Sequence, residues 1–355
     1  MKKTHIDKKI FFYLICFYII SITSIFSFSK FISSNVYTLA LKQTLFYAIG
    51  ILLIFFIKKI NFKKLVKYNT LIYICLIILL GIVLIFGEEI NGTKAWFKIP
   101  LLGTFQPSEF MKISLILTLS NYINENEYKK DLSLLINIFI IILIPSILTF
   151  LEPDTGAVII YFIITLAILL FSKIKKRWLI ILGIIVTILI SLLLYIYNNQ
   201  QEIFINIFGN SMFYRLDRLF DWKSSSGMQL NNSLIAVGSS PIIGNGLNNI
   251  LIYFPEGHTD FIFTSLTSIF GLIGALILII LLISFDFYLL NKIKQTKNKT
   301  KKNIIVATVS ILLFQQIENI AMTIGLLPIT GITLPFISYG GSSLISYMIL
   351  LGLII

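Results

Sequence analysis

Charged residues are scarce in this sequence. Only 13% of its 355 residues are Asp, Glu, Lys or Arg, whereas 57% are hydrophobic, and the mean hydropathy is +0.92. A soluble globule of this size leaves most of its surface facing water and could not cover so many apolar side chains. The composition therefore excludes a soluble protein and indicates one integral membrane domain over residues 1–355.

Cysteine is nearly absent as well. Cys16 and Cys75 both lie inside apolar stretches, so we expect neither a disulfide nor a metal site from them. The apolar run 10–28 follows a basic N-terminus but lacks a small-residue cleavage site, and further apolar runs follow it. We therefore interpret this run as a retained first helix rather than as a signal peptide.

Apolar stretches recur along the whole chain, and one crossing of a bilayer needs roughly 20 such residues. The stretches lie near 10–29, 37–57, 70–87, 107–123, 132–150, 155–172, 178–197, 259–290, 303–327 and 335–355. They predict an all-α membrane protein of about ten transmembrane helices. Because the eighth stretch is long for one crossing, we expect it to begin outside the membrane or to tilt.

Basic residues are unevenly distributed between the segments that join these helices. Of the 29 Lys and Arg, 21 lie in alternate segments, namely the N-terminus, 58–67, 129–130, 173–177 and 292–302. The positive-inside rule then places both termini in the cytoplasm and requires an even number of helices. The net charge of +13 is therefore a signal of topology, and it indicates contact with a lipid bilayer and not with nucleic acid.

The remaining segments are predicted to face outward, and they carry most of the Pro and Gly. They are 88–106, the turn at 151–154, the long loop 198–258 and the turn 327–335. Residues 200–222 are typical of an amphipathic helix lying in the membrane interface, and the alternative is a loop packed on the bundle without lipid contact. The apolar positions of this helix are Phe204, Ile207, Phe208 and Met212.

Two acidic motifs open predicted helices from the outer side. In QPSEFMK at 106–112, Glu109 and Lys112 are three residues apart and share one helix face. An ionisable group inside a membrane costs free energy unless it is paired or functional. The two residues therefore either neutralise each other as an ion pair or face a substrate. In EPDTG at 152–156, Asp154 is either a functional acid or an ordinary helix cap.

Two further motifs lie where outer segments re-enter the membrane. PEGHTDFIF at 255–263 places Asp260 beside His258 and Thr259. A carboxylate at a partly desolvated mouth can act as a general base, although Asp260 could equally cap the next helix. PFISYGGSS at 335–343 supplies Ser338 and the pair Gly340 and Gly341. For these glycines, close helix packing is favoured over phosphate binding.

Together these segments resemble one family, the SEDS proteins, which include RodA, FtsW and SpoVE. The short N-terminus and small cytoplasmic loops are more similar to RodA than to FtsW. The matching stretches are GTKAWFKIPLLGTFQPSEFMK (92–112), EPDTGAVI (152–159), GMQLNNSLIAVGSSPIIGNGL (227–247), PEGHTDFIF (255–263) and NIAMTIGLLPITGITLPFISYGGSS (319–343).

The resemblance implies a peptidoglycan glycosyltransferase of the bacterial cytoplasmic membrane. Such a protein polymerises lipid II at the outer leaflet, here during cell elongation, together with a class B penicillin-binding protein. The resemblance makes Asp260 the essential catalytic acid and assigns supporting roles to Glu109, Lys112 and Asp154. All four lie on the side that the charge bias independently predicts to be outer.

A mechanism follows from this resemblance. Asp260 takes the proton of the acceptor 4-hydroxyl, which attacks the donor anomeric carbon with inversion, and undecaprenyl pyrophosphate leaves. The leaving pyrophosphate needs positive charge or a divalent cation, Mg²⁺ or Mn²⁺, and no other cofactor is expected. Lys112, Arg215 and Arg218 are the candidates for that charge.

The sequence also departs from the family pattern. Ala95 stands before Trp96 where Arg is usual, and Lys94 is expected to substitute for it as a point charge. An additional acid, Glu318, lies within the ninth predicted span and has no assigned role. The other departures are Ser268, Ile269, Ala321 and Thr333.

Two other functions are compatible with the same membrane topology. A lipid II flippase would need a hydrophilic path to the cytoplasmic side, and the sequence shows no ladder of intramembrane charges in that direction. A scaffold without catalytic activity would not need the acids at positions 109, 154 and 260.

Overall fold

The computed structural model of the protein describes residues 7–32, 37–90, 92–100, 103–127, 130–209, 213 and 227–355. In this part of the chain every predicted span corresponds to one helix. These helices are α1 (Lys8–Ser29), α2 (Tyr37–Lys59), α3 (Phe62–Phe86), α4 (Pro107–Glu125), α5 (Asp131–Leu151), α6 (Thr155–Phe171), α7 (Lys176–Asn199), α11 (Ile262–Gln295), α12 (Lys299–Thr323) and α13 (Gly341–Ile354). The prediction of an all-α membrane fold is confirmed.

Seven of the described helices are long and apolar enough to cross a membrane. The shorter helices α6 and α13 are also apolar, whereas α4 carries ionisable residues. Two predicted starts are wrong. The third helix begins at Phe62 because Asn61 caps it by accepting a hydrogen bond from the Lys63 amide, 3.0 Å away. The last helix begins at Gly341 because residues 335–340 form a turn.

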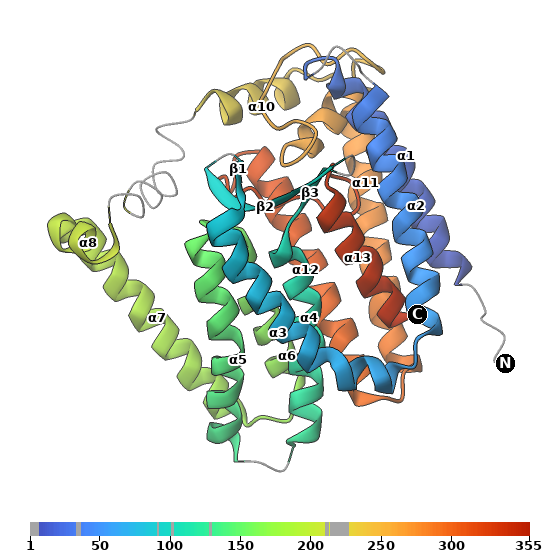
Figure 1. The fold of residues 1–355 in the computed structure, drawn as a ribbon. Helices are drawn as coiled ribbons and strands as arrows, with labels where there is room; N and C mark the ends of the chain where they lie inside the picture. The colour runs from blue at the N-terminus through green and yellow to red at the C-terminus, as the bar shows by residue number, and fades with distance from the viewer. Residues whose placement is uncertain are drawn as a thin grey trace.

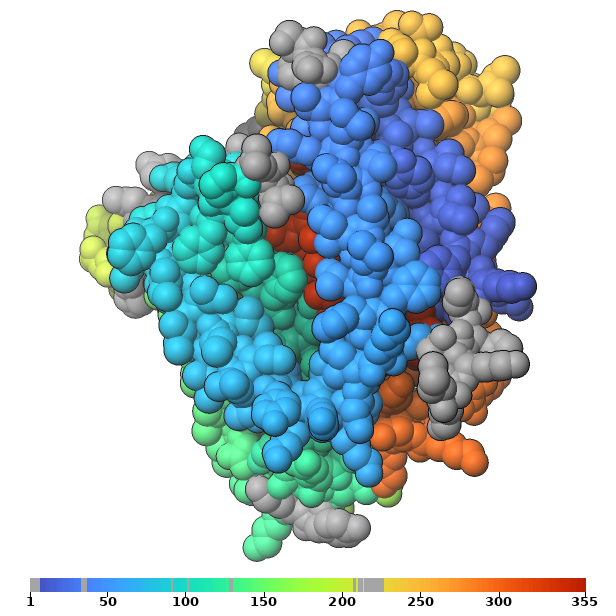
Figure 2. Space-filling model, turned by 45° about the vertical axis from the view of Figure 1, so that its right-hand side comes forward, coloured from blue at the N-terminus to red at the C-terminus, as the bar shows by residue number. Residues whose placement is uncertain are grey.

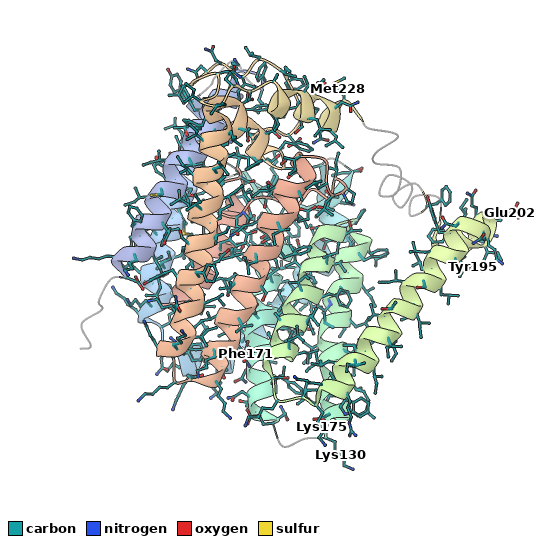
Figure 3. All side chains as sticks on the ribbon, turned by 180° about the vertical axis from the view of Figure 1, so that it is seen from behind. Lys130, Phe171, Lys175, Tyr195, Glu202 and Met228 are labelled. Carbon is teal, nitrogen blue, oxygen red and sulfur yellow. The ribbon has the colours of Figure 1, made fainter. Side chains whose placement is uncertain are left out.

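The helices form a bundle with two distinct ends (Figure 1). The turns that carry most of the lysines gather at one end, the basic end. Lys130 and Lys175 lie there, while Met228 lies at the opposite end (Figure 3). At the basic end, Glu127 forms ion pairs with Lys299 at 2.8 Å and Lys173 at 3.5 Å, and these pairs connect three turns. We call the opposite end the outer end, following the charge bias.

One buried apolar core runs from α1 to α13, with α4 and α12 packed among the other helices. In contrast, α7 extends away from the bundle (Figures 1 and 3). Among its described residues, only Tyr197 is buried. An exposed apolar helix is stable in a bilayer because lipid covers its side chains and its backbone groups bond to one another.

The outer end carries short elements that the composition does not predict. A three-stranded antiparallel sheet joins α3 to α4, and a short helix packs over α11 and α12. The strands are β1 (Glu88–Ile90), β2 (Thr93–Ile99) and β3 (Gly103–Phe105), and the helix is α10 (Met228–Gly238). The hydroxyl of Ser233 on α10 donates to the Thr323 carbonyl at 2.9 Å and so ties this helix to the end of α12.

Only part of the predicted interfacial helix lies in the described residues. Helix α8 (Gln201–Phe208) begins at the predicted place, and Phe204 is buried against Tyr197 and Phe213. Phe204 therefore packs on protein side chains and not on lipid. Met212, Arg215 and Arg218 lie outside the described residues.

The long helix α11 bends at Gly271, whose φ of +66° is outside the helical range. The bend leaves backbone carbonyls without helical partners, and the outer loop supplies them. The amides of Asn245 and Gly246 donate to the carbonyls of Ser268 and Ile269, each at 3.0 Å. The long eighth stretch therefore contains a local kink, and its start outside the membrane or its tilt stays a prediction. Ser268 and Ile269, two of the departures from the family pattern, are therefore the residues to which this loop bonds.

We expect Gly244→Ala to destabilise the protein strongly. A Cβ at Gly244 would lie 2.2 Å from the Ile269 carbonyl oxygen, and the residue has a φ of +80°. Overpacking costs about 1–3 kcal/mol, and the left-handed backbone costs a side chain about 1–2 kcal/mol more. Gly246→Ala is the matched control, because its φ is +85° but its Cβ would meet nothing within 4 Å. Equal losses of thermal stability in detergent would contradict this explanation.

Candidate functional site

Glu109 and Lys112, both on α4, form an ion pair that faces α13. Pro107 begins α4, and one helical turn brings Glu109 Oε2 to 2.5 Å from Lys112 Nζ. The side chains are 12% and 2% exposed, so the cation is the more buried partner. Ser346 of α13 donates to Glu109 Oε2 at 3.1 Å, and the Tyr347 ring lies 5.4 Å from the ammonium. The pair therefore connects two helices that are distant in sequence.

Asp154 caps a helix and also bonds to a second helix. Its Oδ1 caps α6 by accepting from the Ala157 amide at 2.9 Å. Its Oδ2 accepts from the Gln106 side chain at 2.8 Å and from the Ser108 hydroxyl at 3.4 Å. A cap is a local interaction, but the second set of bonds fixes α6 against the start of α4. Asp154 thus belongs to one polar group with the ion pair.

Glu152 is a buried acid next to this group. Neither of its carboxyl oxygens has a hydrogen-bond partner among the described residues. Burial, together with the neighbouring charge of Asp154, raises the pKa of Glu152 to about 9. Glu152 is therefore protonated at neutral pH and adds no charge to the outer end.

Asp260 lies in the turn just before α11, at the outer end. Phe261, and not Asp260, is the N-terminal cap residue of α11. Among the described residues, none donates a hydrogen bond to the half-buried Asp260 carboxylate, whereas its backbone carbonyl accepts from Asn319 of α12 at 2.7 Å. Burial, and then the charges of Glu256 and Glu318, raise the pKa of Asp260 well above its ordinary value. Such a carboxylate is free to accept a proton from a bound group.

The segment around Ser338 holds the Asp260 turn in place. The Ser338 hydroxyl donates to the Thr259 carbonyl at 2.6 Å, and the Tyr339 amide donates to the His258 carbonyl at 2.9 Å. The His258 ring stacks on Phe28 with a centroid distance of 6.2 Å. The turn is therefore held through the backbone carbonyls of His258 and Thr259, the His258 ring and the Ser338 hydroxyl.

The glycine pair packs against another helix. A Cβ at Gly341 would lie 2.8 Å from the Phe46 ring of α2, so only glycine allows this approach. The Gly340 amide faces Gln43 Oε1 at 3.4 Å. Close helix packing, the favoured alternative, explains Gly341, whereas a Cβ at Gly340 would meet Ser343 at 2.6 Å.

A short segment separates the two acidic groups. A Cβ at Gly156, beside Asp154, would lie 3.1 Å from Ile332 and 3.5 Å from the Thr330 carbonyl. On the other side, a Cβ at Gly331 would lie 3.7 Å from Asp260 Oδ2. Residues 330–332 therefore run between the Asp154 group and Asp260, and the motifs form one site at the outer end.

The bundle is hollowed on the face beside this site. In Figure 2, α2 and α3 diverge and expose parts of α4 and α13 between them. The Glu109–Ser346 hydrogen bond joins those same two helices. The hollow opens sideways, toward the lipid that surrounds a membrane bundle.

Lys94 lies on the other face of its strand from Ala95, the position where the family has arginine. Side chains alternate along β2, and Ala95 is buried while Lys94 lies on the opposite face. The Lys94 ammonium donates to the Ile85 carbonyl at 2.9 Å, at the end of α3. The substitution of Lys94 for this arginine stays a prediction. Trp96 keeps a buried indole N–H that has no partner among the described residues.

The described residues contain no group of three or more His, Cys, Asp or Glu that could hold a metal ion. The role of Mg²⁺ or Mn²⁺ beside the pyrophosphate stays a prediction.

Several polar partners in the site were not selected from the sequence. Their shared signal is a polar side chain within an apolar helix or at its first turn, where burial requires a hydrogen-bond partner. They are Gln43, Gln106, Ser108, Asn319, Ser346 and Tyr347.

Comparisons with known proteins find relatives that match nearly the whole chain. The probable peptidoglycan glycosyltransferase FtsW of Wigglesworthia glossinidia brevipalpis is 35% identical and matches 98% of this chain and 92% of its own length. The peptidoglycan glycosyltransferase MrdB of Helicobacter pylori is 31% identical over 99% of this chain and 89% of its own.

Solved structures share the fold. A chain of a peptidoglycan synthase complex superposes with a TM-score of 0.79 at 21% identity, covering 99% of this chain and 97% of its own. The rod shape determining protein RodA of Thermus thermophilus gives 0.71 at 22% identity, covering 100% and 97%. The model of the FtsW, RodA and SpoVE family of cell cycle proteins matches residues 6–355. The chain is therefore a multi-pass membrane protein that belongs to the FtsW, RodA and SpoVE family.

Proposed function

We propose that this protein is a peptidoglycan glycosyltransferase that polymerises lipid II into β-1,4 glycan at the outer face of the bacterial cytoplasmic membrane. Asp260 supports the proposal most directly. Its carboxylate lies at the outer end, does not cap a helix and receives no hydrogen bond from the described residues. The names of the relatives support the same activity.

Asp260 is the general base in this proposal. Its carboxylate takes the proton of the acceptor 4-hydroxyl while that oxygen forms a bond to the donor anomeric carbon. The bond from that carbon to the pyrophosphate oxygen breaks, undecaprenyl pyrophosphate carries away the electron pair, and the configuration inverts. A positioned base contributes about 10²- to 10⁴-fold to such a step.

Lys112 was expected to supply positive charge for the pyrophosphate, but it is paired with Glu109. Its ammonium is 2.5 Å from Glu109 and almost fully buried, so the pair as a whole is neutral. We therefore propose that Lys112 and Glu109 shape the site, with Asp154, and that the charge for the pyrophosphate comes from Arg215 and Arg218 or from a divalent cation. The hollow between α2 and α3 offers an entrance for the lipid chain (Figure 2).

A class B penicillin-binding protein is the proposed partner, since one structural relative is part of a peptidoglycan synthase complex. We further propose a role in cell elongation, as expected for a RodA-like protein, although relatives of both the FtsW and the MrdB type are found. Depletion in the native cells tests this role. Rounded cells would support elongation, and long filaments without septa would contradict it.

Fluorescent lipid II supplied to the purified protein, with and without its partner, tests the activity. We expect a ladder of glycan chains on a gel. Movement of lipid II across liposomes without chains would instead identify a flippase. If a folded protein bound to its partner neither makes chains nor moves lipid II, it is a scaffold.

A further inference from the structure

Glu318 is an acid in the outer part of α12 to which the motifs assign no role. Its side chain is 4% exposed. One carboxyl oxygen accepts a hydrogen bond from the Thr330 hydroxyl, and the other is buried without a partner among the described residues. A buried acid of this kind is costly, so its position needs an explanation.

The surroundings of Glu318 connect it to Asp260. Asn319, the next residue on α12, donates to the carbonyls of Asp260 and Ile332, both at 2.7 Å. Thr330, which donates to Glu318, precedes Gly331, and Gly331 faces Asp260 Oδ2. Two successive residues of α12 therefore hold both the turn that carries Asp260 and the segment in front of it.

We propose that Glu318 is a positioning residue for Asp260, which fixes the 330–332 segment through Thr330 and places a second acid beside the catalytic carboxylate. This inference rests on the proposed glycosyltransferase activity. According to this proposal, Glu318 sets the pH range in which the protein is active.

The direction in which Glu318 shifts the pKa of Asp260 follows from the charges that face Asp260. Glu256 acts from its own turn, and Glu318 acts from α12. His258, in the same turn, has a pKa lowered by burial and is neutral at pH 7, and residues 324–340 contain no charged side chain. Because a nearby negative charge disfavours ionisation, the Glu318 charge raises the pKa of Asp260. A base with a higher pKa accepts protons more readily but is ionised only at higher pH.

Glu318→Gln tests the charge, because the amide oxygen still accepts from Thr330. We expect the acidic limb of the kcat/KM profile for lipid II to move to lower pH by roughly 0.5–1 unit. Below that limb the variant should be about three- to ten-fold faster than the parent. Thr330→Val is the complementary change, since it removes the hydrogen bond and keeps the charge. It should lower the rate without moving the limb.

Asp286→Asn is the matched control, because Asp286 is also a buried acid within a helix but lies toward the basic end of α11. It should leave the profile in place. If Glu318→Gln does not fold, Glu318→Met is a second neutral variant, because it leaves no unpartnered oxygen at this position. The role of Glu318 would be overturned if the parent is active and a folded neutral variant has the same acidic limb of the kcat/KM profile. A parent that makes no glycan would instead overturn the proposed function.

Discussion

Replacing Asp260 with Asn is expected to reduce glycan polymerisation by about 10²- to 10⁴-fold, the usual contribution of a positioned general base. The amide is similar in size to the carboxyl group but cannot accept the proton of the attacking hydroxyl. The contact that holds this turn uses the Asp260 backbone carbonyl, which accepts from Asn319 and is unchanged by the substitution. The variant should therefore fold and fail only in chemistry. Initial rates with fluorescent lipid II, measured in the complex with the partner, provide the test.

Asp286→Asn again provides the control, because it makes the same change at a buried acid far from the outer turn. We expect this variant to keep the parental rate. A folded Asp260→Asn protein that polymerises lipid II at the rate of the control would show that another group is the base. Binding of lipid II should persist in the variant, since proton transfer and not binding is lost.

The second large effect concerns the ion pair inside the bundle. Glu109→Met leaves the Lys112 ammonium, which is 2% exposed, without its counter-charge. Breaking a buried ion pair from one side typically costs about 3–5 kcal/mol. We therefore expect a large loss of thermal stability in detergent. The double variant Glu109→Met with Lys112→Met removes both charges and should regain most of that loss.

Activity of the double variant then separates a structural pair from a functional one. We propose that the pair shapes the substrate site, so the stable double variant should remain at least about 10-fold slower than the parent. A double variant that is both stable and as active as the parent would reduce the pair to charge neutralisation. A Glu109→Met protein as stable as the parent would show that Lys112 does not depend on Glu109.

Helix number and orientation could be derived from the sequence because both depend on local properties. The length of an apolar run decides whether a segment can cross a bilayer, and the positions of lysine and arginine decide which ends face the cytoplasm. The ten predicted spans are accordingly found as helices in the described part of the chain. Their boundaries were wrong where capping by Asn61 or the turn before Gly341 determined the first residue.

For the site residues too, the sequence motifs decided some questions and left others open. The family motifs identified Asp260, Asp154, Glu109 and Lys112 because each lies in a short, specific pattern. The same patterns could not decide whether Asp260 caps a helix. They also could not show that Lys94 lies on the other face of β2 from Ala95.

The sequence by itself thus determined the membrane class, the helix count, the orientation and the acids of the outer end. Only the tertiary structure decided what each acid touches. It joined the Glu109–Lys112 pair to Ser346 of α13, tied Asp154 to Gln106, and brought Glu318 near Asp260 through Asn319 and residues 330–332. The reason is that most of these contacts join residues far apart in the chain. Apolar length and charge bias are local properties, whereas a buried polar group takes whichever partner the packing of distant helices brings within bonding distance.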